Sequence, residues 1–154
     1  MANKTFSGSG DLGMKWHKFL VFMLWIGAAL NILSGLGYFT DLLYGEITPE
    51  IYAAYPPLKL FDMGTGVALI LFALFQFVVR GRLKKLCSNG PKLLIASYVI
   101  IIVLNVATTV VPAILAPEYI TMDVASISGS IVGQIAMIAI NSSYYKKRED
   151  VFVN

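Results

Sequence analysis

Four long stretches without a charged residue limit the fold of this chain more than any other feature. They are 17 to 25 residues long and run from Phe19 to Thr40, Met63 to Val79, Leu93 to Pro117 and Val124 to Tyr145. A helix rises about 1.5 Å per residue, so roughly 20 apolar residues cross a hydrocarbon core about 30 Å thick. The stretches predict transmembrane helices at about 19–40, 60–79, 93–114 and 124–145.

The predicted fold class is all-α, a four-helix transmembrane bundle that forms one integral membrane domain over residues 1–154. A mean hydropathy of +0.73 agrees with this class. The segments between the spans are short, so no separate soluble domain is expected. The first stretch is expected to stay in the mature protein, because it exceeds the roughly 7–15 apolar residues of a signal peptide.

Eleven of the twelve lysine and arginine residues lie on one side of the predicted membrane, and Lys59 lies on the other. The eleven are Lys4, Lys15, Lys18, Arg80, Arg82, Lys84, Lys85, Lys92, Lys146, Lys147 and Arg148. Cytoplasmic flanks of membrane helices are enriched in these residues. We therefore expect a multi-pass protein of the cell (plasma) membrane with both termini in the cytoplasm.

The same basic residues indicate which molecules the chain binds at the membrane surface. Each basic residue close to an anionic leaflet contributes about 1 kcal/mol of attraction. We expect contacts with anionic lipid headgroups from Arg80, Arg82, Lys84, Lys85, Lys146, Lys147 and Arg148. The net charge of +3 is explained by these flanks, so no nucleic-acid partner is expected.

Polar side chains recur at mid-membrane depth. Asn31, Asn105 and Gln134 lie near the centres of the first, third and fourth spans, and Ser34 and Thr108 follow on the same helix faces. Because hydrocarbon offers no hydrogen bonds, all five should face the bundle interior. They form hydrogen bonds between helices, or they line a site for a small solute or headgroup. No ionisable residue lies near the midplane, which argues against an ion-driven carrier.

The other side of the predicted membrane carries an acidic pair, Asp62 and Asp123. Each precedes or opens a span, so each is expected to be a first-turn or N-cap residue, with attraction of a cation as the alternative. Five tyrosines on this side are interpreted as interfacial anchors: Tyr38, Tyr44, Tyr52, Tyr55 and Tyr119.

Prolines and glycines predict local structure. Pro56 is expected to begin the second span, a turn over 88–91 to precede the third, and Pro112 to kink or end the third, leaving 113–117 irregular. Gly129 and Gly133 form a GxxxG pattern that is interpreted as packing within the bundle, with dimerisation as the alternative.

The first and third spans resemble each other. A shift of 74 residues places Lys18 on Lys92 and Asn31 on Asn105. This match indicates two tandem helix hairpins, as in parallel transporter repeats. Chance similarity of apolar segments is the alternative.

The sequence contains no recognisable catalytic or metal-binding set. The predicted spans contain no His, Glu or Cys, and His17 and Cys87 each occur once. We therefore expect no enzymatic activity, cofactor or metal. The run NSSYYKKREDVF, from Asn141 to Phe152, resembles the ending of many small, uncharacterised four-span proteins of bacterial inner membranes. That resemblance implies an inner-membrane location and supplies no activity.

The expected function is that of a non-enzymatic membrane component. The alternative is a homo-oligomeric permease or channel subunit for a small solute. Four helices leave little room for a pathway within one protomer, so the permease would need several copies.

Overall fold

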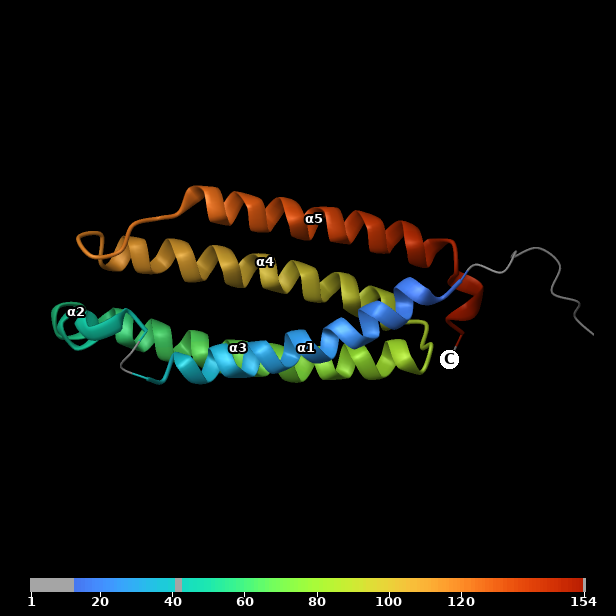
Figure 1. Ribbon diagram of the computed structural model, residues 1–154, viewed down its shortest axis with the longest axis horizontal. Coiled ribbons are helices and arrows are strands. Elements are labelled where there is room, and N and C mark those ends of the chain that lie inside the picture. Colours follow the sequence, from blue (N-terminus) through green and yellow to red (C-terminus); the bar gives the residue numbers. More distant parts are fainter. Residues whose placement is uncertain (1–12, 41–42, 154) are drawn as a thin grey trace, which may run out of the picture.

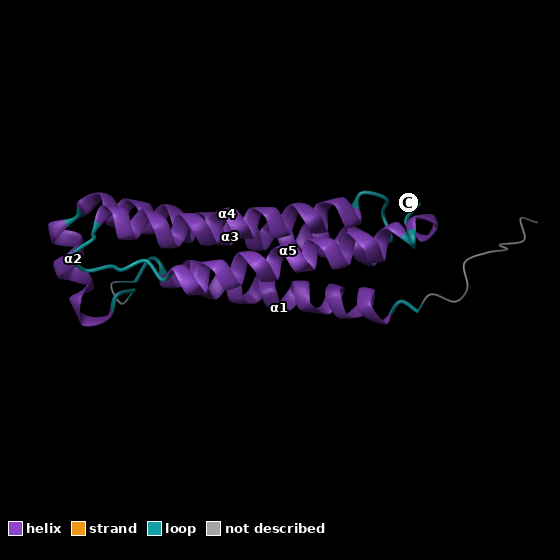
Figure 2. Cartoon of the chain, turned by 90° about the horizontal axis from the view of Figure 1, so that it is seen from above, coloured by secondary structure: helices purple, strands orange, loops and turns teal. Residues whose placement is uncertain are grey.

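The computed structural model describes residues 13–40 and 43–153 (Figure 1). Every regular element in these ranges is helical (Figure 2), and their order is α1 (Lys15–Gly37), η1 (Gly45–Ile47), α2 (Thr48–Ala54), α3 (Pro56–Lys84), α4 (Gly90–Leu115), α5 (Val124–Lys146) and η2 (Glu149–Val151). Helices α1, α3, α4 and α5 are long and apolar enough to cross a membrane. The predicted all-α bundle with four spans is confirmed, and the chain is a multi-pass membrane protein.

The helix starts follow the proline positions. Helix α3 begins at Pro56, where a missing N–H costs nothing in the first turn, and α4 begins at Gly90 with Pro91 next. Both starts agree with the sequence prediction. The seven-residue helix α2 was not predicted, because its sequence carries no long apolar period.

One of the two expectations for Pro112, that it ends the regular part of the helix, was wrong, and only 116–117 of the residues expected to be irregular are non-helical. Helix α4 continues through this residue to Leu115, so 113–115 are helical. Pro112 cannot donate to the carbonyl of Thr108, but the Ala116 N–H donates to the Pro112 carbonyl over 2.9 Å and completes one further turn. A membrane helix tolerates the loss of one hydrogen bond when neighbouring groups stabilise the backbone.

The four long helices form two hairpins. Helix α1 packs against α3, α5 packs against α4, and contacts between α3 and α4 join the pairs. In Figure 1, α1 and α3 lie together below α4 and α5. This arrangement agrees with the tandem hairpins that the sequence suggested.

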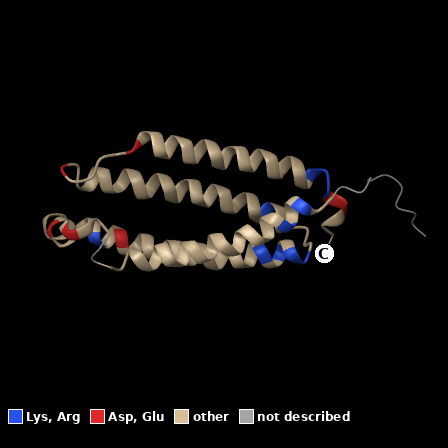
Figure 3. Cartoon of the chain, viewed as in Figure 1, with Lys and Arg blue, Asp and Glu red and all other residues tan. Residues whose placement is uncertain are grey.

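Charged residues gather at the two ends of the bundle (Figure 3). The basic end carries Lys15, Lys18, Arg80, Arg82, Lys84, Lys85, Lys92, Lys146, Lys147 and Arg148, together with Glu149 and Asp150. The acidic end carries Glu46, Glu50, Asp62, Glu118 and Asp123, together with Lys59. The predicted flanking residue Lys4 lies outside the described residues.

Helices α1 and α5 are joined at the basic end. Trp16 donates to Asn141 over 2.9 Å, and the His17 ring lies 3.1 Å from the Tyr145 hydroxyl. These residues adjoin a buried apolar cluster of Leu20, Leu24, Val79, Leu83, Leu94, Tyr145 and Phe152. Among the described residues, α1 and α5 share no hydrogen bond nearer the acidic end.

A second apolar cluster stabilises the acidic end. It consists of Ile51, Tyr52, Leu58 and Ala116, so it connects α2 to the beginning of α3 and the end of α4. Apolar contacts therefore consolidate the bundle at both ends.

The backbones of α1 and α3 touch at Gly35 and Gly66. A Cβ atom on Gly35 would lie 2.8 Å from the Gly66 carbonyl oxygen, and a Cβ on Gly66 would lie 2.7 Å from the Gly35 carbonyl oxygen. Both distances are too short for a side chain, so only glycine permits this approach. Small residues have the same role at close helix crossings in other membrane proteins.

The GxxxG pattern on α5 does not pack inside the bundle. Both Gly129 and Gly133 are exposed, and a Cβ on either would meet no atom within 4 Å. The interpretation as internal packing was therefore wrong. The reason is that α5 contacts its neighbours through another face, on which Ser130 bonds to α4.

We predict that alanine at Gly35 or Gly66 destabilises the protomer by about 1–3 kcal/mol, because the added methyl group forces the two backbones apart. Thermal unfolding in detergent measures the effect. The matched control is alanine at Gly129 or Gly133, which should leave monomer stability unchanged. Equal losses at the two glycine pairs would contradict the assigned crossing.

Candidate functional site

A cavity of about 460 Å³ lies between α1, α3 and α4 near the middle of the bundle. We call it the central cavity. It is lined by Asn31, Ser34, Gly37, Tyr38, Leu43, Leu69, Ile101, Leu104, Asn105 and Thr108. Four of the five side chains that the sequence placed in a polar cluster thus meet on one cavity, and Gln134 does not line it.

The amides of the central cavity bond within each hairpin. Asn31 donates to the Gln76 side-chain oxygen over 2.8 Å, which joins α1 to α3. Asn105 donates to the Ser130 hydroxyl over 2.8 Å, which joins α4 to α5. Neither hydrogen bond uses the amide oxygen of Asn31 or Asn105, so both oxygens can accept a hydrogen bond from a ligand.

Gln134 lies near the middle of α5 but apart from this cluster. Its Oε1 atom is buried and has no hydrogen-bond partner among the described residues. Gln76, rather than Gln134, supplies the additional amide next to Asn31. The position of each residue along its helix follows from the sequence, but the rotation of α5 about its axis does not.

A second cavity of about 170 Å³ adjoins the first on the side of the acidic end. We call it the acidic-end cavity. It shares Tyr38, Leu43 and Thr108 with the central cavity and is completed by Tyr44, Asp62, Thr109, Pro112, Ile120 and Thr121. The two cavities therefore form one polar region from mid-bundle to the acidic end.

Asp62 is the acidic group of this region and is fully buried, with 0% of its surface exposed. Its Oδ2 atom accepts hydrogen bonds from the Tyr44 hydroxyl at 2.9 Å and the Tyr52 hydroxyl at 3.0 Å. Its Oδ1 atom is buried and has no hydrogen-bond partner among the described residues.

The expected first-turn role of Asp62 was wrong. Helix α3 begins at Pro56, so Asp62 lies in the second turn, where the backbone N–H groups already bond within the helix. Asp123 behaves as predicted, because its side chain caps α5 by accepting the Ser126 N–H over 3.0 Å. Asp123 is exposed, so the two aspartates are not an equivalent pair.

The tyrosine partners of Asp62 come from the segment before α3. Burial, and then the hydrogen bond to Asp62, raise the pKa of the Tyr44 phenol above its ordinary value of 10.0. This phenol is therefore a proton donor at neutral pH. Tyr44 and Tyr52 were interpreted as interfacial anchors, since α2, which turns Tyr52 inward, was not foreseen.

Cations are absent from the walls of both cavities. Among the described residues, no Lys, Arg or His lines either one. At the same end of the bundle, the Lys59 ammonium lies 5.5 Å from the centre of the Tyr52 ring. The described residues also contain no set of three His, Cys, Asp or Glu side chains that could hold a metal ion.

The residues expected to contact headgroups all lie at the basic end, but they differ in their surroundings. Arg82, Lys84, Lys85, Lys146 and Lys147 are exposed. Arg80 donates to the Val21 carbonyl, and Arg148 is buried with its guanidinium 3.8 Å from the centre of the Tyr144 ring. The Arg148 guanidinium also donates to the Tyr144 and Gly13 carbonyls, so it is engaged within the protein.

We predict that Asn31 is energetically coupled to Gln76 and not to Asn105. A double-mutant cycle with alanine should give about 0.6–2 kcal/mol for the Asn31–Gln76 pair and almost none for Asn31 with Asn105. Unfolding in mixed detergent measures both cycles. The reverse pattern would mean that the amides bond between the hairpins.

Comparison with known proteins gives the site no precedent. The chain has no significant match to a family model, a curated protein or a solved structure. The chemistry of the site must therefore be inferred from its own residues.

Proposed function

We propose that this chain is a non-enzymatic membrane component that binds a small protonated amine in the acidic-end cavity, with Asp62 as the counter-ion. The observation that carries the proposal is the unpartnered Oδ1 atom of the fully buried Asp62.

Burying a carboxylate costs free energy, because the group loses its hydration. A buried charge is stable only when it is paired or fully hydrogen-bonded. Tyr44 and Tyr52 satisfy one oxygen of Asp62, and the walls offer the other no cation. An ammonium group in the cavity would complete this arrangement.

The walls suit a small organic cation better than a bare ion. Hydroxyl groups of Thr108, Thr109 and Thr121 can accept N–H donors, and Tyr38 and Tyr44 present aromatic rings that attract a cation. The Thr108 carbonyl is a further acceptor, because Pro112 has no N–H to donate to it. A volume of about 170 Å³ restricts the ligand to a few heavy atoms unless it extends into the central cavity.

The charge distribution supports an orientation for the site. Basic flanks favour the cytoplasm, so the basic end and both termini are assigned to the cytoplasmic side of the plasma membrane. The acidic-end cavity then faces the exterior. This orientation is compatible with the bacterial inner-membrane location that the C-terminal run implies.

A permease or channel subunit is the second candidate. The polar region extends from Asp62 to Asn31 and Asn105, halfway along the bundle. Beyond it, the apolar cluster around Leu20 and Leu83 blocks the basic end. Transport would therefore require the hairpins to separate or several copies to assemble, and the open glycine face of α5 offers a surface for the latter.

We predict that ethylammonium chloride raises the melting temperature of the wild-type chain in nanodiscs, whereas ethanol, of similar size and neutral, does not. Asp62→Asn should abolish the ethylammonium effect because it removes the charge. Asp123→Asn is the matched control and should retain it. Equal stabilisation of the Asp62→Asn variant, or none of the wild type, would sink the proposal.

A pH titration tests the same site without a substitution. Protons compete with the amine for the Asp62 carboxylate, so ethylammonium binding to the wild type should weaken as the pH falls. Binding that is unchanged by acidification would exclude Asp62 as the counter-ion.

We also predict the topology. In a Cys87→Ser background, a membrane-impermeant maleimide should label Lys59→Cys in intact cells and Lys84→Cys only after permeabilisation. Both positions are exposed, which makes them a matched pair. The opposite labelling pattern would invert the assigned orientation.

A further inference from the structure

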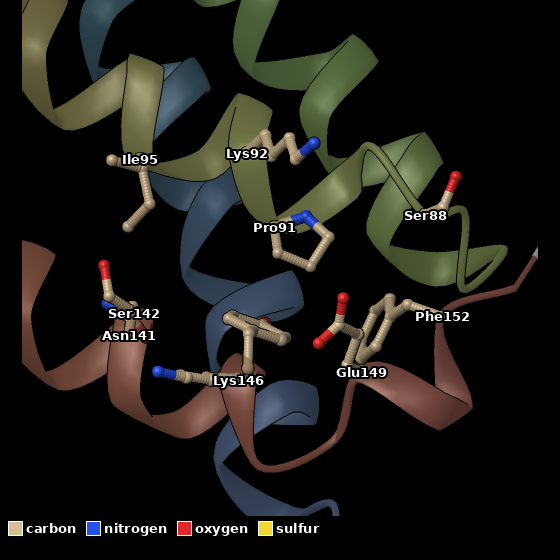
Figure 4. A pocket seen from close by; sticks show the side chains of 10 residues that line it. Ser88, Pro91, Lys92, Ile95, Asn141, Ser142, Lys146, Glu149 and Phe152 are labelled. Atoms are coloured by element: carbon tan, nitrogen blue, oxygen red, sulfur yellow. The ribbon is translucent and has the colours of Figure 1, made fainter.

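A third cavity, of about 390 Å³, lies at the basic end between the start of α4, the end of α5 and η2 (Figure 4). We call it the basic-end pocket. It is separate from the cavities at Asp62 and shares no lining residue with them. It is therefore a separate candidate binding site.

Charged side chains of both signs line the pocket. Lys92 comes from α4, Lys146 from the end of α5, and Glu149 from η2. Figure 4 shows the Glu149 carboxylate between the two elements that carry the lysines. Among the described residues, no ion pair joins Glu149 to either lysine. The Lys92 and Lys146 ammonium groups point away from each other in Figure 4, but both side chains are exposed and flexible and can turn toward a ligand.

The rest of the wall combines the polar residues Ser88, Asn141 and Ser142 with apolar and aromatic side chains, part of which lie deeper in the bundle. Ile95 is one turn further along α4 than Lys92, and Pro91 and Phe152 flank the entrance (Figure 4). Lys92 and Lys146 border two candidate spans, so the pocket lies where lipid headgroups meet hydrocarbon. Basic pockets between membrane helices at this depth bind lipid headgroups.

We propose that the basic-end pocket binds a phospholipid whose headgroup carries both a phosphate and a primary ammonium. The phosphate lies between Lys92 and Lys146, the ammonium pairs with Glu149, and the glycerol and upper acyl chain contact Ile95. A free phosphate would use the lysines but leave the apolar wall and Glu149 without a role. A purely anionic headgroup would place negative charge beside Glu149.

Native mass spectrometry of the purified full-length chain tests this proposal with dioleoyl phosphatidylethanolamine as the probe. The comparison ligands are dioleoyl phosphatidylglycerol, dioleoylglycerol and inorganic phosphate. We expect phosphatidylethanolamine to bind most tightly and the other three to bind at least about fivefold more weakly. Tighter binding of phosphatidylglycerol or of inorganic phosphate would overturn the proposal.

Charge variants distinguish lipid binding in the basic-end pocket from a general electrostatic attraction of lipid to the basic end. The double substitution Lys92→Gln with Lys146→Gln should lower phosphatidylethanolamine binding about tenfold or more. Lys18→Gln with Lys84→Gln removes the same charge from exposed positions outside the pocket and should change little. Equal losses in the two double variants would overturn the proposal.

Glu149→Gln tests the assigned role of the carboxylate. This exposed residue can change without loss of packing, so the variant should fold. It should lose the preference for phosphatidylethanolamine over phosphatidylglycerol and retain binding of both. An unchanged preference would refute the ammonium contact.

Discussion

Hydrocarbon cannot form hydrogen bonds, and the organisation of this bundle depends on that constraint. Each long helix satisfies its own backbone, and polar side chains pair where two helices meet. The Asn31–Gln76 and Asn105–Ser130 bonds each lie within one hairpin. The contact between Gly35 and Gly66 brings α1 and α3 close enough for dispersion forces to act along both backbones. Each hairpin is thus internally bonded, and the polar surface left between them becomes a cavity.

Asp62 is an exception to this pairing of polar groups, because one oxygen of its buried carboxyl group has no hydrogen-bond partner. It lies in the second turn of a membrane helix. Tyr44 and Tyr52 reduce the cost by donating to one of its oxygens. The same two tyrosines hold the segment before α3 against the bundle, so the structure of the acidic end and the chemistry of Asp62 depend on each other. A ligand that supplies the missing positive charge would therefore also stabilise this end.

The two ends of the molecule differ in the contacts that join α1 to α5. At the basic end, Trp16 and His17 join α1 to α5, and Arg148 packs its guanidinium on the Tyr144 ring. Farther along, α1 and α5 share no hydrogen bond among the described residues, and the polar cavities lie on that side. A bound phospholipid between α4 and α5 at the basic end would stabilise the joined end. A solute at Asp62 would act on the other.

The sequence by itself determined the number of spans, the segregation of charge and the depth of Asn31, Asn105 and Gln134. These follow from composition and helical rise, which are local properties. Only the tertiary structure decided which polar groups meet, because that depends on how each helix is rotated and where it crosses its neighbour. Gln134 has the predicted depth but not the predicted neighbours, and Gly129 faces outward although its spacing suits packing. The buried position of Asp62 was not foreseen, because the inward turn of its partners Tyr44 and Tyr52 depends on α2, a short helix stabilised by long-range contacts.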